Sequence, residues 1–423
     1  MKMFLAVLTP LLLGACAHAA PAVPAPAGEV RVLAGADRLF TEYAQLIRGR
    51  RLALVANHSS RLADGTHLAD ALHAYPDAKL EVLFGMEYDI RTNDYSLPQD
   101  PDSVIDGPTG LVKYDLYYGR THKPTRQMLG DVQTIVVDLQ DVGARFYEHI
   151  NVLGFVMEAA AENGIDVVVL DRPNPIGPTR PDGFVADAAD FFGFGSYGPV
   201  PVVHGLTMGE LARFYDGEKL LRGGGGARLH VVPMKGWRRG MWLDRTGLPW
   251  RKPSPNLVSF ESVLDYPGTC LFEATNLSEG RGSDTPFQLV GAPWLDSERA
   301  TSLLNALGLP GVVFEPVAFT PERRPFLSRP PRRAGQRLNG IRLRVTDRDA
   351  FQPFRAGVAM LWAVHRLHPD SLAWSDDAIR RLAGTTRLKT MIEEGKRPEE
   401  IFAAWGPELQ AFRQRSAKYR LYD

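Results

Sequence analysis

Four short apolar runs recur in the first half of the chain, and a cluster of polar residues follows each of them. The runs are Leu52 to Ala56, Leu80 to Phe84, Thr134 to Asp138 and Asp166 to Leu170. Their length and their β-branched residues are typical of fully buried strands. Segments with helical spacing lie between the runs, at Leu68 to Tyr75, Thr125 to Leu129 and Val152 to Asn163. This alternation predicts an α/β domain with a parallel sheet.

The polar clusters are expected to meet at one edge of that sheet, because right-handed crossovers keep parallel strands pointing the same way. Open α/β sheets bind their ligands at this edge. The long stretch from Thr92 to Tyr118 contains several Pro and Gly residues and is expected to cover the edge as a lid or binding wall. The four clusters are Asn57-His58-Ser59-Ser60, Glu87-Tyr88-Asp89 with Arg91, Leu139 to Glu148, and Asp171-Arg172-Pro173-Asn174.

The second half reads as a smaller mixed α/β domain. The pattern predicts a strand at Ile341 to Thr346 and helices at Phe354 to His365 and Pro398 to Ser416. The glycine run Gly223 to Gly226 is a plausible hinge, which gives two domains at 30–225 and 226–423. Upstream of the hinge, Thr207-Met-Gly-Glu210 reads as a capping box, so Glu210 is expected to serve the start of a helix.

The composition excludes several classes of protein. Lys plus Arg equals Asp plus Glu at 49 each, so the overall charge does not point to nucleic acid. No Gly-rich phosphate loop follows the first run, and no HExxH, GxSxG, Walker or tight metal-ligand motif is present. After Cys16 only Cys270 remains, which rules out an intrachain disulfide and favours a small buried side chain.

The start of the chain carries an export signal. Met1-Lys2 precedes the apolar segment Phe4 to Leu13, and Leu13-Gly-Ala-Cys16 resembles a bacterial lipoprotein box. Residues 1–16 are then a lipoprotein signal peptide ending at an acylated Cys16, and the Ala- and Pro-rich residues 17–29 are a tether. The alternative is a plain secretory peptide cut after Ala17 to Ala20. Both interpretations predict an exported, periplasmic protein, and the first adds a lipid anchor in a membrane.

Carboxylates are the candidate chemistry of the converging loops. A pair of them is the minimal apparatus for glycoside hydrolysis, with one as proton donor and the other as base, nucleophile or stabiliser. Tyr and Trp side chains would suit stacking on sugar rings, although buried Trp is more often core. The carboxylates are Glu87, Asp89, Asp141, Glu148, Asp171, Glu273 and Glu279, and the aromatic residues are Tyr88, Tyr147, Trp237, Trp242 and Trp250.

Seven ordered motifs together resemble the bacterial exo-β-N-acetylmuramidase family of peptidoglycan hydrolases. They are Asp138-Leu-Gln-Asp-Val-Gly-Ala-Arg-Phe-Tyr147, Leu170-Asp-Arg-Pro-Asn-Pro175, His204-Gly-Leu-Thr-Met-Gly-Glu210, Thr246-Gly-Leu-Pro-Trp250, Pro253-Ser-Pro-Asn256, Thr275-Asn-Leu-Ser-Glu-Gly-Arg-Gly282 and Gly291-Ala-Pro-Trp294. The resemblance implies a Rossmann-like N-terminal domain, a smaller C-terminal domain and an active site in the cleft between them. It also implies release of N-acetylmuramic acid, or a disaccharide bearing it, from non-reducing ends of cell-wall glycan, without a redox cofactor.

The resemblance assigns Glu87 as acid/base, with Asp141 or Glu279 as second carboxylate. The family's usual histidine and glycine after this glutamate are replaced by Tyr88 and Asp89, and Asp89 is expected to raise the proton affinity of Glu87 by repulsion. The candidate substrate-binding residues are Asn57, His58, Tyr88, Arg145, Tyr147, Asp171, Arg172, Asn174, His204, Glu273, Asn276 and Arg281.

Two structural alternatives and two functional ones stay open. Arg145 can instead clamp an Asp, and Arg281 can pair with Glu279 or Glu273 to brace the loop. A non-catalytic lipoprotein that binds cell-wall glycan is the second functional hypothesis, favoured by the altered neighbours of Glu87. A nucleotide-dependent oxidoreductase is the third, and it lacks its phosphate loop.

Overall fold

The computed structural model describes residues 32–87, 89–92, 103–117, 119, 121–193, 195–223, 225–325 and 330–423. The proposed signal peptide, Cys16, the tether, Tyr88 and part of the stretch from Thr92 to Tyr118 lie outside these residues. Within the described residues, no helix is both long enough and apolar enough to cross a membrane.

The first half is built on a sheet whose described strands run in the order β11-β6-β5-β1-β2-β4-β3. Every neighbouring pair is parallel except β3 with β4, which is antiparallel at the edge. The four apolar runs are β1, β2, β5 and β6, so the predicted parallel sheet is confirmed. Its strands are β1 Arg51–Ala56, β2 Lys79–Gly85, β3 Val104–Ile105, β4 Val112–Asp115, β5 Thr134–Asp138, β6 Asp166–Leu170 and β11 Arg228–Val232.

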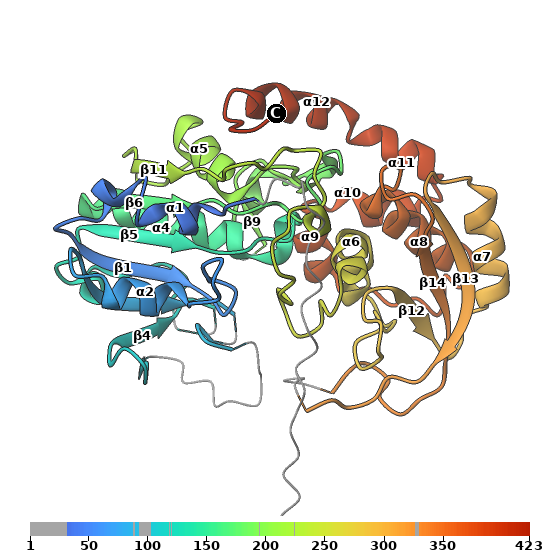
Figure 1. The fold of residues 1–423 in the computed structure, drawn as a ribbon. Helices are drawn as coiled ribbons and strands as arrows, with labels where there is room; N and C mark the ends of the chain where they lie inside the picture. The colour runs from blue at the N-terminus through green and yellow to red at the C-terminus, as the bar shows by residue number, and fades with distance from the viewer. Residues whose placement is uncertain are drawn as a thin grey trace, which may run out of the picture. The chain divides into compact units, whose positions relative to one another are not determined.

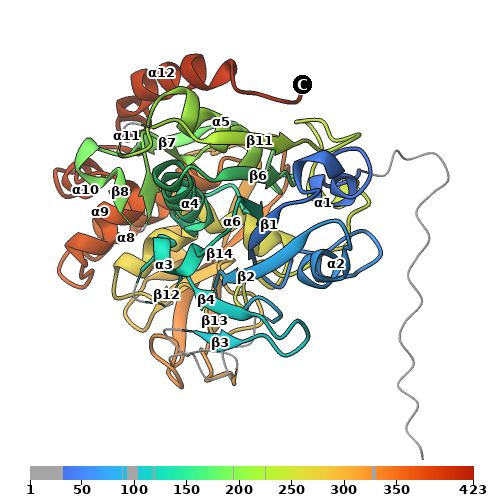
Figure 2. The ribbon, with the colours of Figure 1, turned by 90° about the vertical axis from the view of Figure 1, so that its left-hand side faces the viewer.

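Helices cover both faces of this sheet, as the alternation of strands and helices predicts (Figures 1 and 2). Leu52 and Leu54 of β1 pack with Leu68 and Leu72 on one face, and the intervening Ala53 packs toward the other face. Burying one such leucine stabilises the fold by about 1.5–3 kcal/mol. The helices of this half are α1 Gly35–Leu39, α2 Leu68–Ala74, α3 Arg126–Leu129, α4 His149–Asn163 and α5 Met208–Gly217, with short 3₁₀ turns η1 Ala44–Leu46, η2 Arg145–Tyr147 and η3 Ala188–Asp190.

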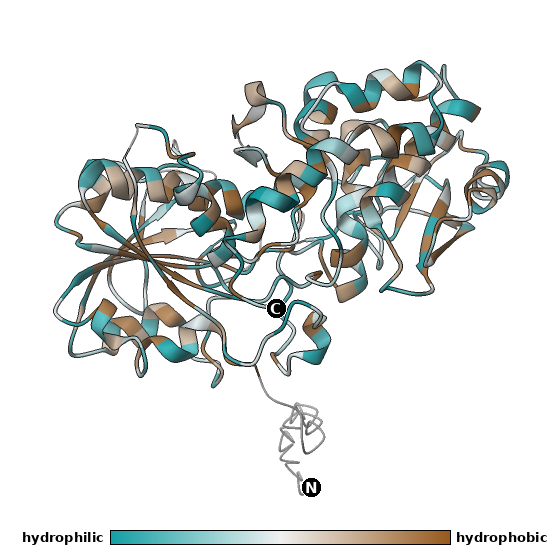
Figure 3. Ribbon diagram, turned by 90° about the horizontal axis from the view of Figure 1, so that it is seen from above, coloured by the Kyte–Doolittle hydropathy of each residue, from teal (hydrophilic) through white to brown (hydrophobic). Residues whose placement is uncertain are grey.

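The apolar strands therefore form the middle layer of this half, as the hydropathy colours show (Figure 3). The strand β11 pairs with β6, so the first sheet includes a strand beyond residue 225. Two small antiparallel ribbons lie between β6 and α5 in the sequence. They pair β7 Asp182–Val185 with β10 Pro201–Val203, and β8 Phe192–Gly193 with β9 Ser196–Tyr197.

The second half contains an antiparallel sheet in the order β12-β14-β13, packed with helices. The predicted helix from Pro398 to Ser416 is two helices that meet at the buried Trp405, because Pro407 has no N–H for a continuing helix. The elements are η4 Leu243–Arg245, α6 Phe260–Thr269, η5 Cys270–Ala274, β12 Leu289–Ala292, α7 Ser297–Ala306, β13 Val312–Phe319, β14 Leu338–Val345, α8 Pro353–Leu367, α9 Asp376–Ala383, α10 Arg387–Glu393, α11 Pro398–Ala404 and α12 Gly406–Ala417.

Two connections join the halves. The loop after β5 contributes Val142, Phe146 and Tyr147 to the same hydrophobic core as α6 and α8. The last helix, α12, returns to the first half, where Phe412 packs against Phe214 of α5 with ring centroids 5.6 Å apart (Figure 1). The strand ends of the first sheet are therefore held against elements of the second half.

Candidate active site

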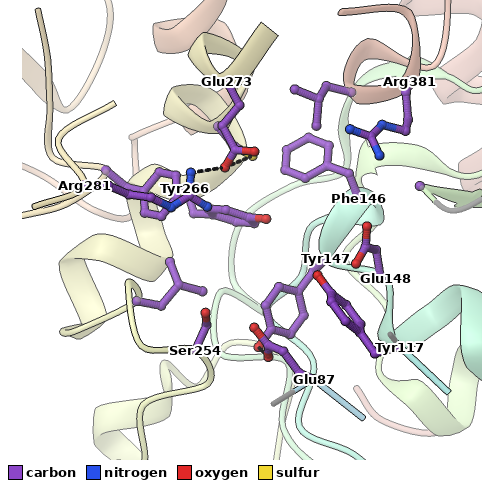
Figure 4. Close-up of a pocket in the computed structure, with 15 residues that line it drawn as sticks. Glu87, Tyr117, Phe146, Tyr147, Glu148, Ser254, Tyr266, Glu273, Arg281 and Arg381 are labelled. Atoms are coloured by element: carbon purple, nitrogen blue, oxygen red, sulfur yellow. Dashed lines mark hydrogen bonds and ion pairs between the residues drawn. The ribbon is translucent and has the colours of Figure 1, made fainter. Parts of the chain in front are cut away.

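A cavity of about 110 Å³ lies where the loops after β2 and β5 meet α6, η5 and α9 (Figure 4). Its walls combine several acidic and basic groups with aromatic rings. They are formed by Glu87, Tyr117, Phe146, Tyr147, Glu148, Gly195, Ser254, Leu257, Tyr266, Cys270, Glu273, Arg281, Phe287, Arg381 and Leu382.

Glu87 is a buried carboxyl group that lies two residues beyond β2. The Tyr147 hydroxyl is 3.0 Å from its Oε2, and the Ser254 side chain also hydrogen-bonds to it. Burial raises the pKa of Glu87 to about 8, because desolvation outweighs these two hydrogen bonds and the attraction of Arg281. Glu87 is therefore a carboxylic acid that holds its proton at neutral pH.

Glu148 is a second acid on the same cavity, at the junction of η2 and α4. Burial also raises the pKa of Glu148 to about 8, against the opposing effects of a hydrogen bond with Tyr117 and the charge of Arg381. The negative charges of Glu87 and Glu273 raise this pKa further. Ionisation of one of the two acids therefore helps to keep the proton on the other.

Backbone strain is concentrated at this cavity. Glu87, Glu148 and Phe287 have φ angles of 50°, 79° and 66°, in the left-handed region that side chains other than glycine rarely adopt. They are three of the five described non-glycine residues with positive φ. Such strain costs about 1–3 kcal/mol per residue and clusters at functional sites, because the surrounding structure must hold it in place.

Aromatic rings form one wall of the cavity. Tyr266 makes edge contacts with Phe146, Tyr147 and Phe287 at centroid distances of 5.4, 6.2 and 4.9 Å. Its helix approaches α8 closely, where a Cβ on Gly268 would lie 2.1 Å from the Pro353 carbonyl oxygen. A glycine is therefore required where α6 crosses α8, and this crossing fixes the position of the aromatic wall.

Two arginines give the cavity its positive charge. The Nη1 atom of Arg281 is 2.7 Å from Glu273 Oε1 and 2.8 Å from Glu279 Oε1, and its guanidinium stacks over Phe287. Arg381 of α9 makes no hydrogen bond or ion pair with any described side chain, and its charge faces Glu148. The described residues contain no group of three or more His, Cys, Asp and Glu side chains arranged to hold a metal ion.

Comparisons with known proteins match nearly the whole of the chain. The model of the N-terminal part of exo-beta-N-acetylmuramidase NamZ matches residues 52–261, and the model of its C-terminal part matches residues 264–422. Peptidoglycan beta-N-acetylmuramidase NamZ of Bacillus subtilis is 38% identical over the full length of both chains. The chain belongs to this exo-β-N-acetylmuramidase family.

Two solved structures share the fold. A DUF1343 family protein of Bacteroides fragilis has a TM-score of 0.85 at 32% identity, with 93% of this chain and all of that chain covered. A second DUF1343 protein of the same organism has a TM-score of 0.75 at 28% identity, with 93% and 99% covered. The α/β class, with a Rossmann-like N-terminal part, is thereby confirmed.

Four of the predicted site residues of this family member meet at the cavity. They are Glu87, Tyr147, Glu273 and Arg281. Glu279, the predicted alternative for the second carboxylate, is buried behind Arg281 rather than on the cavity wall. The predicted pairing of Arg281 with Glu279 or Glu273 is confirmed with both glutamates, and Arg281 also lines the cavity, while its role in binding substrate stays a prediction.

Asp141, the other predicted second carboxylate, does not reach the cavity. Its Oδ2 accepts hydrogen bonds from the Gly143 amide at 2.7 Å and from His204 Nε2 at 3.1 Å. His204 is fixed in this tautomer because its Nδ1 accepts from the Leu206 amide. Asp141 and His204 therefore hold the loop after β5 in shape.

Arg145 is also placed inside the protein and away from the cavity. It is fully buried and donates hydrogen bonds to the carbonyl oxygens of Phe184, Gly195, Val200 and Leu382. A guanidinium in this position joins the small ribbons to the end of α9 and is not among the residues that line the cavity.

The cluster after β6 is likewise used for structure. Asp171 accepts from the Thr207 hydroxyl, the Gly209 amide, the Arg172 amide and the Tyr422 hydroxyl at 2.6–3.1 Å. Arg172 forms a two-pronged ion pair with Asp138, at 2.5 and 2.8 Å. Asn174 bridges the Ile176 amide and the Leu206 carbonyl. The capping box of Thr207 and Glu210 is confirmed beside this cluster.

Three further candidates contact backbone rather than the cavity. The Oδ1 of Asn57 accepts from the Ser59 amide and hydroxyl, and His58 Nε2 lies 2.7 Å from the Lys252 carbonyl oxygen. Asn276 bonds to the Ser371 carbonyl and the Ala373 amide. Tyr88 lies outside the described residues. Asn57, His58 and Asn276 therefore hold the shape of the loops that carry them.

The expected effect of Asp89 on Glu87 is wrong. Asp89 forms an ion pair with Lys113 and accepts from the Arg91 amide, so its charge is balanced by Lys113. Burial, and not repulsion by Asp89, raises the pKa of Glu87.

Sequence reasoning gave no role to several residues of the cavity. Ser254 lies in the Pro253-Ser-Pro-Asn256 motif, and this motif could have identified it as a residue of the site. Glu148 was among the converging carboxylates but received no function. Tyr117, Tyr266 and Arg381 carry no local signal, because only tertiary contacts bring them to the site. Trp237 and Trp242, considered for sugar stacking, are buried in the core.

Proposed function

We propose that this protein is an exo-acting glycosidase that releases N-acetylmuramic acid, or a disaccharide bearing it, from non-reducing ends of peptidoglycan fragments. Its membership of the exo-β-N-acetylmuramidase family and the activity named for its Bacillus subtilis relative support this substrate. The observation that carries the proposal is Glu87, a buried and protonated acid in a cavity with a second acid.

The hydrogen bonds around Glu87 fit a proton donor. The Tyr147 oxygen lies 2.7 Å from the Pro253 carbonyl oxygen and 3.0 Å from Glu87 Oε2. A phenol has one proton, and the carbonyl can only accept. The Tyr147 hydroxyl therefore shares its single proton between the Pro253 carbonyl and Glu87 Oε2, which orients the Glu87 carboxyl group and favours its ionised form. In the reaction, Glu87 transfers its own proton to the glycosidic oxygen as the bond to the leaving group breaks.

Glu148 is proposed as the second acid of the pair, in place of Asp141 or Glu279. Its carboxyl group is electrostatically coupled to Glu87 and faces the positive charge of Arg381. When Glu87 has given its proton to the leaving group, a water molecule forms the new bond to the anomeric carbon, and Glu148 in its ionised form accepts the proton that this water releases. Arg281 and Arg381 suit the binding of the lactyl carboxylate, and the aromatic wall suits packing against the sugar ring.

The substitution Glu87→Gln tests this function. It keeps the shape and removes the transferable proton, so kcat on a chromogenic N-acetylmuramic acid glycoside is expected to fall about 10²–10⁴-fold. Glu261→Gln, at an exposed position of α6, is the matched control and should retain normal turnover. Thermal melting should show that both variants are folded. Near-normal turnover by Glu87→Gln would contradict the assignment.

The same assay separates the enzyme from a non-catalytic glycan-binding protein. Calorimetry with a peptidoglycan-derived glycan would detect binding by either. Binding by the unsubstituted protein without release of N-acetylmuramic acid during a long incubation would overturn the proposed activity.

We further propose that the protein is exported and held at a membrane by a lipid on Cys16, in the periplasm. The lipoprotein-like residues 1–16 and the Ala- and Pro-rich tether support this localisation. Cys16→Ser should move the protein from the membrane fraction to the soluble fraction of the producing cells. Equal amounts of both proteins in the membrane fraction would contradict the lipid anchor.

A further inference from the structure

A second, smaller cavity lies at the centre of the first sheet's ligand-binding edge. The strands β1 and β5 are neighbours in the sheet, and the chain runs outward from them in opposite directions, toward β2 and toward β6. Open α/β sheets bind ligands at this switch point. The loops after β1, β5 and β6 supply Ser59, Gln140 and Arg172 to the cavity, which has a volume of about 40 Å³. This space suits a single small group rather than a sugar ring.

Three arginines line this cavity, and their hydrogen bonds leave donors unused. Arg61 donates from Nε to the His58 carbonyl and from Nη1 to the Gly65 carbonyl. Arg172 uses Nε and Nη2 for Asp138 and for the Arg61 carbonyl. Each guanidinium carries five N–H groups in a fixed fork, so both retain donors for another partner.

Arg251 is the third arginine, and it forms no hydrogen bond or ion pair with any described residue. It is half-buried, and the wall beside it is formed by the side chains of Leu243, Leu248 and Pro249. Burial and the charges of Arg61 and Arg172 lower the pKa of Arg251. Its guanidinium therefore lies in a positive potential next to apolar groups, where an anion would be bound strongly.

The acidic groups nearby do not cancel this charge. Asp138 is engaged by Arg172 on both oxygens, and Asp37 accepts hydrogen bonds from the Ala34 and Ala63 amides. Three arginines against two aspartates leave one positive charge in excess, located at the unpaired guanidinium. A dehydrated, unpaired charge of this kind is costly unless it has a counter-ion.

We propose that the cavity between Arg61, Arg172 and Arg251 is a binding site for one small oxyanion, a carboxylate or a phosphate. The planar forks of three arginines match the oxygen geometry of both groups. The segment that carries Arg251 continues through Pro253, which lines this cavity, to Ser254, which lines the cavity of Glu87. The anion site is thus separate from the catalytic cavity and adjoins it.

Isothermal titration calorimetry of the full chain with inorganic phosphate, at low ionic strength, tests the site without requiring hydrolysis. The unsubstituted protein is expected to bind phosphate, and Arg251→Met should weaken this binding by about tenfold or more. Arg245→Met is the matched control, since Arg245 is exposed on the same segment and forms no ion pair with any residue that the structure describes. Arg251→Lys, which keeps the charge but loses the fork, should bind with intermediate affinity.

Equal phosphate affinity in Arg251→Met and the unsubstituted protein would overturn the proposal, as would the absence of binding of both phosphate and acetate. Melting temperatures would show that each variant is folded. This result is independent of the proposed glycosidase activity. A protein that bound phosphate at Arg251 and hydrolysed no glycan would support the anion site and contradict only the proposed activity.

Inhibition by phosphate then identifies the source of the anion. If phosphate inhibits hydrolysis of a longer peptidoglycan glycan but not of a chromogenic single-sugar substrate, the anionic group belongs to the glycan. If it inhibits neither, the ligand is a free small anion. Both outcomes support the anion site. If phosphate inhibits the hydrolysis of both substrates, and does so equally in Arg251→Met and in the unsubstituted protein, phosphate binds in the catalytic cavity instead, and the proposed site is overturned.

Discussion

Two pairs of acids lie at the same edge of the sheet, but only one pair lines the cavity. Glu87 and Glu148 line the cavity on strained backbone, whereas Asp141 and Asp171 are buried among hydrogen-bond donors. Both pairs follow buried strands or the loops attached to them, so their positions in the sequence pattern are equivalent. Their surroundings therefore decide which acids can transfer protons and which hold the fold.

The number of donors separates Asp171 from Glu87. Burial raises the pKa of both Glu87 and Asp171, but four donors hold the pKa of Asp171 at about 6 and two hydroxyl groups leave that of Glu87 at about 8. An acid with all its oxygens engaged cannot release or accept a proton without breaking those bonds. The comparison predicts that substitutions in the cavity change activity and substitutions among the braces change stability.

The largest effect is expected for Glu148→Gln. If Glu148 is the partner of Glu87, kcat on the chromogenic glycoside should fall about 10²-fold or more, because the amide can neither ionise nor donate in the same way. The melting temperature should stay the same or rise, since a buried ionisable group is removed. Glu261→Gln again serves as the control. Full activity in Glu148→Gln would leave Glu273 as the cavity's remaining candidate for the second carboxylate.

Asp171→Asn is expected to show the reverse pattern. The amide group must face donors from Thr207, Gly209 or Tyr422, so the free energy of unfolding should fall by about 2–4 kcal/mol. Urea denaturation measures this loss, and kcat of the folded protein should stay within about threefold of normal. Tyr422→Phe removes a single donor and should cost about 1 kcal/mol. A large loss of kcat without a loss of stability would contradict the division between the two pairs.

The sequence predicted the sheet and the edge of the site because both depend on local patterns. The runs that became β1, β2, β5 and β6 have strand length and apolar content, and parallel order then brings their ends together. Glu87 could be predicted as a site residue because the glutamate of the family's motif is kept there, although Tyr88 and Asp89 replace the histidine and glycine that usually follow it. The sequence could not show that Asp141, Arg145 and Asp171 form hydrogen bonds inside the protein, because their hydrogen-bond partners lie between 1 and 251 positions away in the chain.

Several residues of the cavity that the sequence did not single out lie in the second half of the chain, and they too are brought to the site by tertiary contacts. Tyr266 and Arg381 are placed by the packing of α6 and α9, and nothing in their own segments distinguishes them from residues of ordinary amphipathic helices. The ion pair between Asp89 and Lys113 could not be predicted from local sequence either, which is why Asp89 was expected to act on Glu87. Tertiary packing, rather than periodicity, determines these features.

A smaller effect concerns the pH dependence of stability. The pKa of Glu87 is about 8 in the folded protein and near 4.5 in an unfolded chain, so folding holds its proton. The stability that this group contributes is complete below about pH 4.5 and is lost as the pH rises through 8. Glu87→Gln lacks this loss, so it should match the unsubstituted protein at pH 5 and exceed it by about 1–3 kcal/mol at pH 9.

Urea denaturation at the two pH values measures the difference between the proteins. Glu148 contributes a dependence of the same sign to both proteins, and losing the charge of Glu87 lowers the pKa of Glu148 in the variant, which adds to the variant's gain at pH 9. An Asp141→Asn variant should not show the same gain at pH 9, because that acid lies outside the cavity and is bonded to Gly143 and His204. Parallel pH profiles for Glu87→Gln and the unsubstituted protein would show that burial does not hold the proton on Glu87.

The smallest effect is expected for Tyr147→Phe, which tests the link between the braced loop and the cavity. The Tyr147 hydroxyl lowers the pKa of Glu87, so its removal should raise that pKa and move the alkaline limb of the kcat profile to higher pH. At pH 6 kcat should fall about three- to tenfold, since one positioning hydrogen bond is lost. Tyr266→Phe, on the same cavity but without a contact to Glu87, should leave the alkaline limb in place. A shift of that limb to lower pH in Tyr147→Phe would mean that the phenol stabilises the protonated acid, and that the loop after β5 raises the proton affinity of Glu87 instead of restraining it.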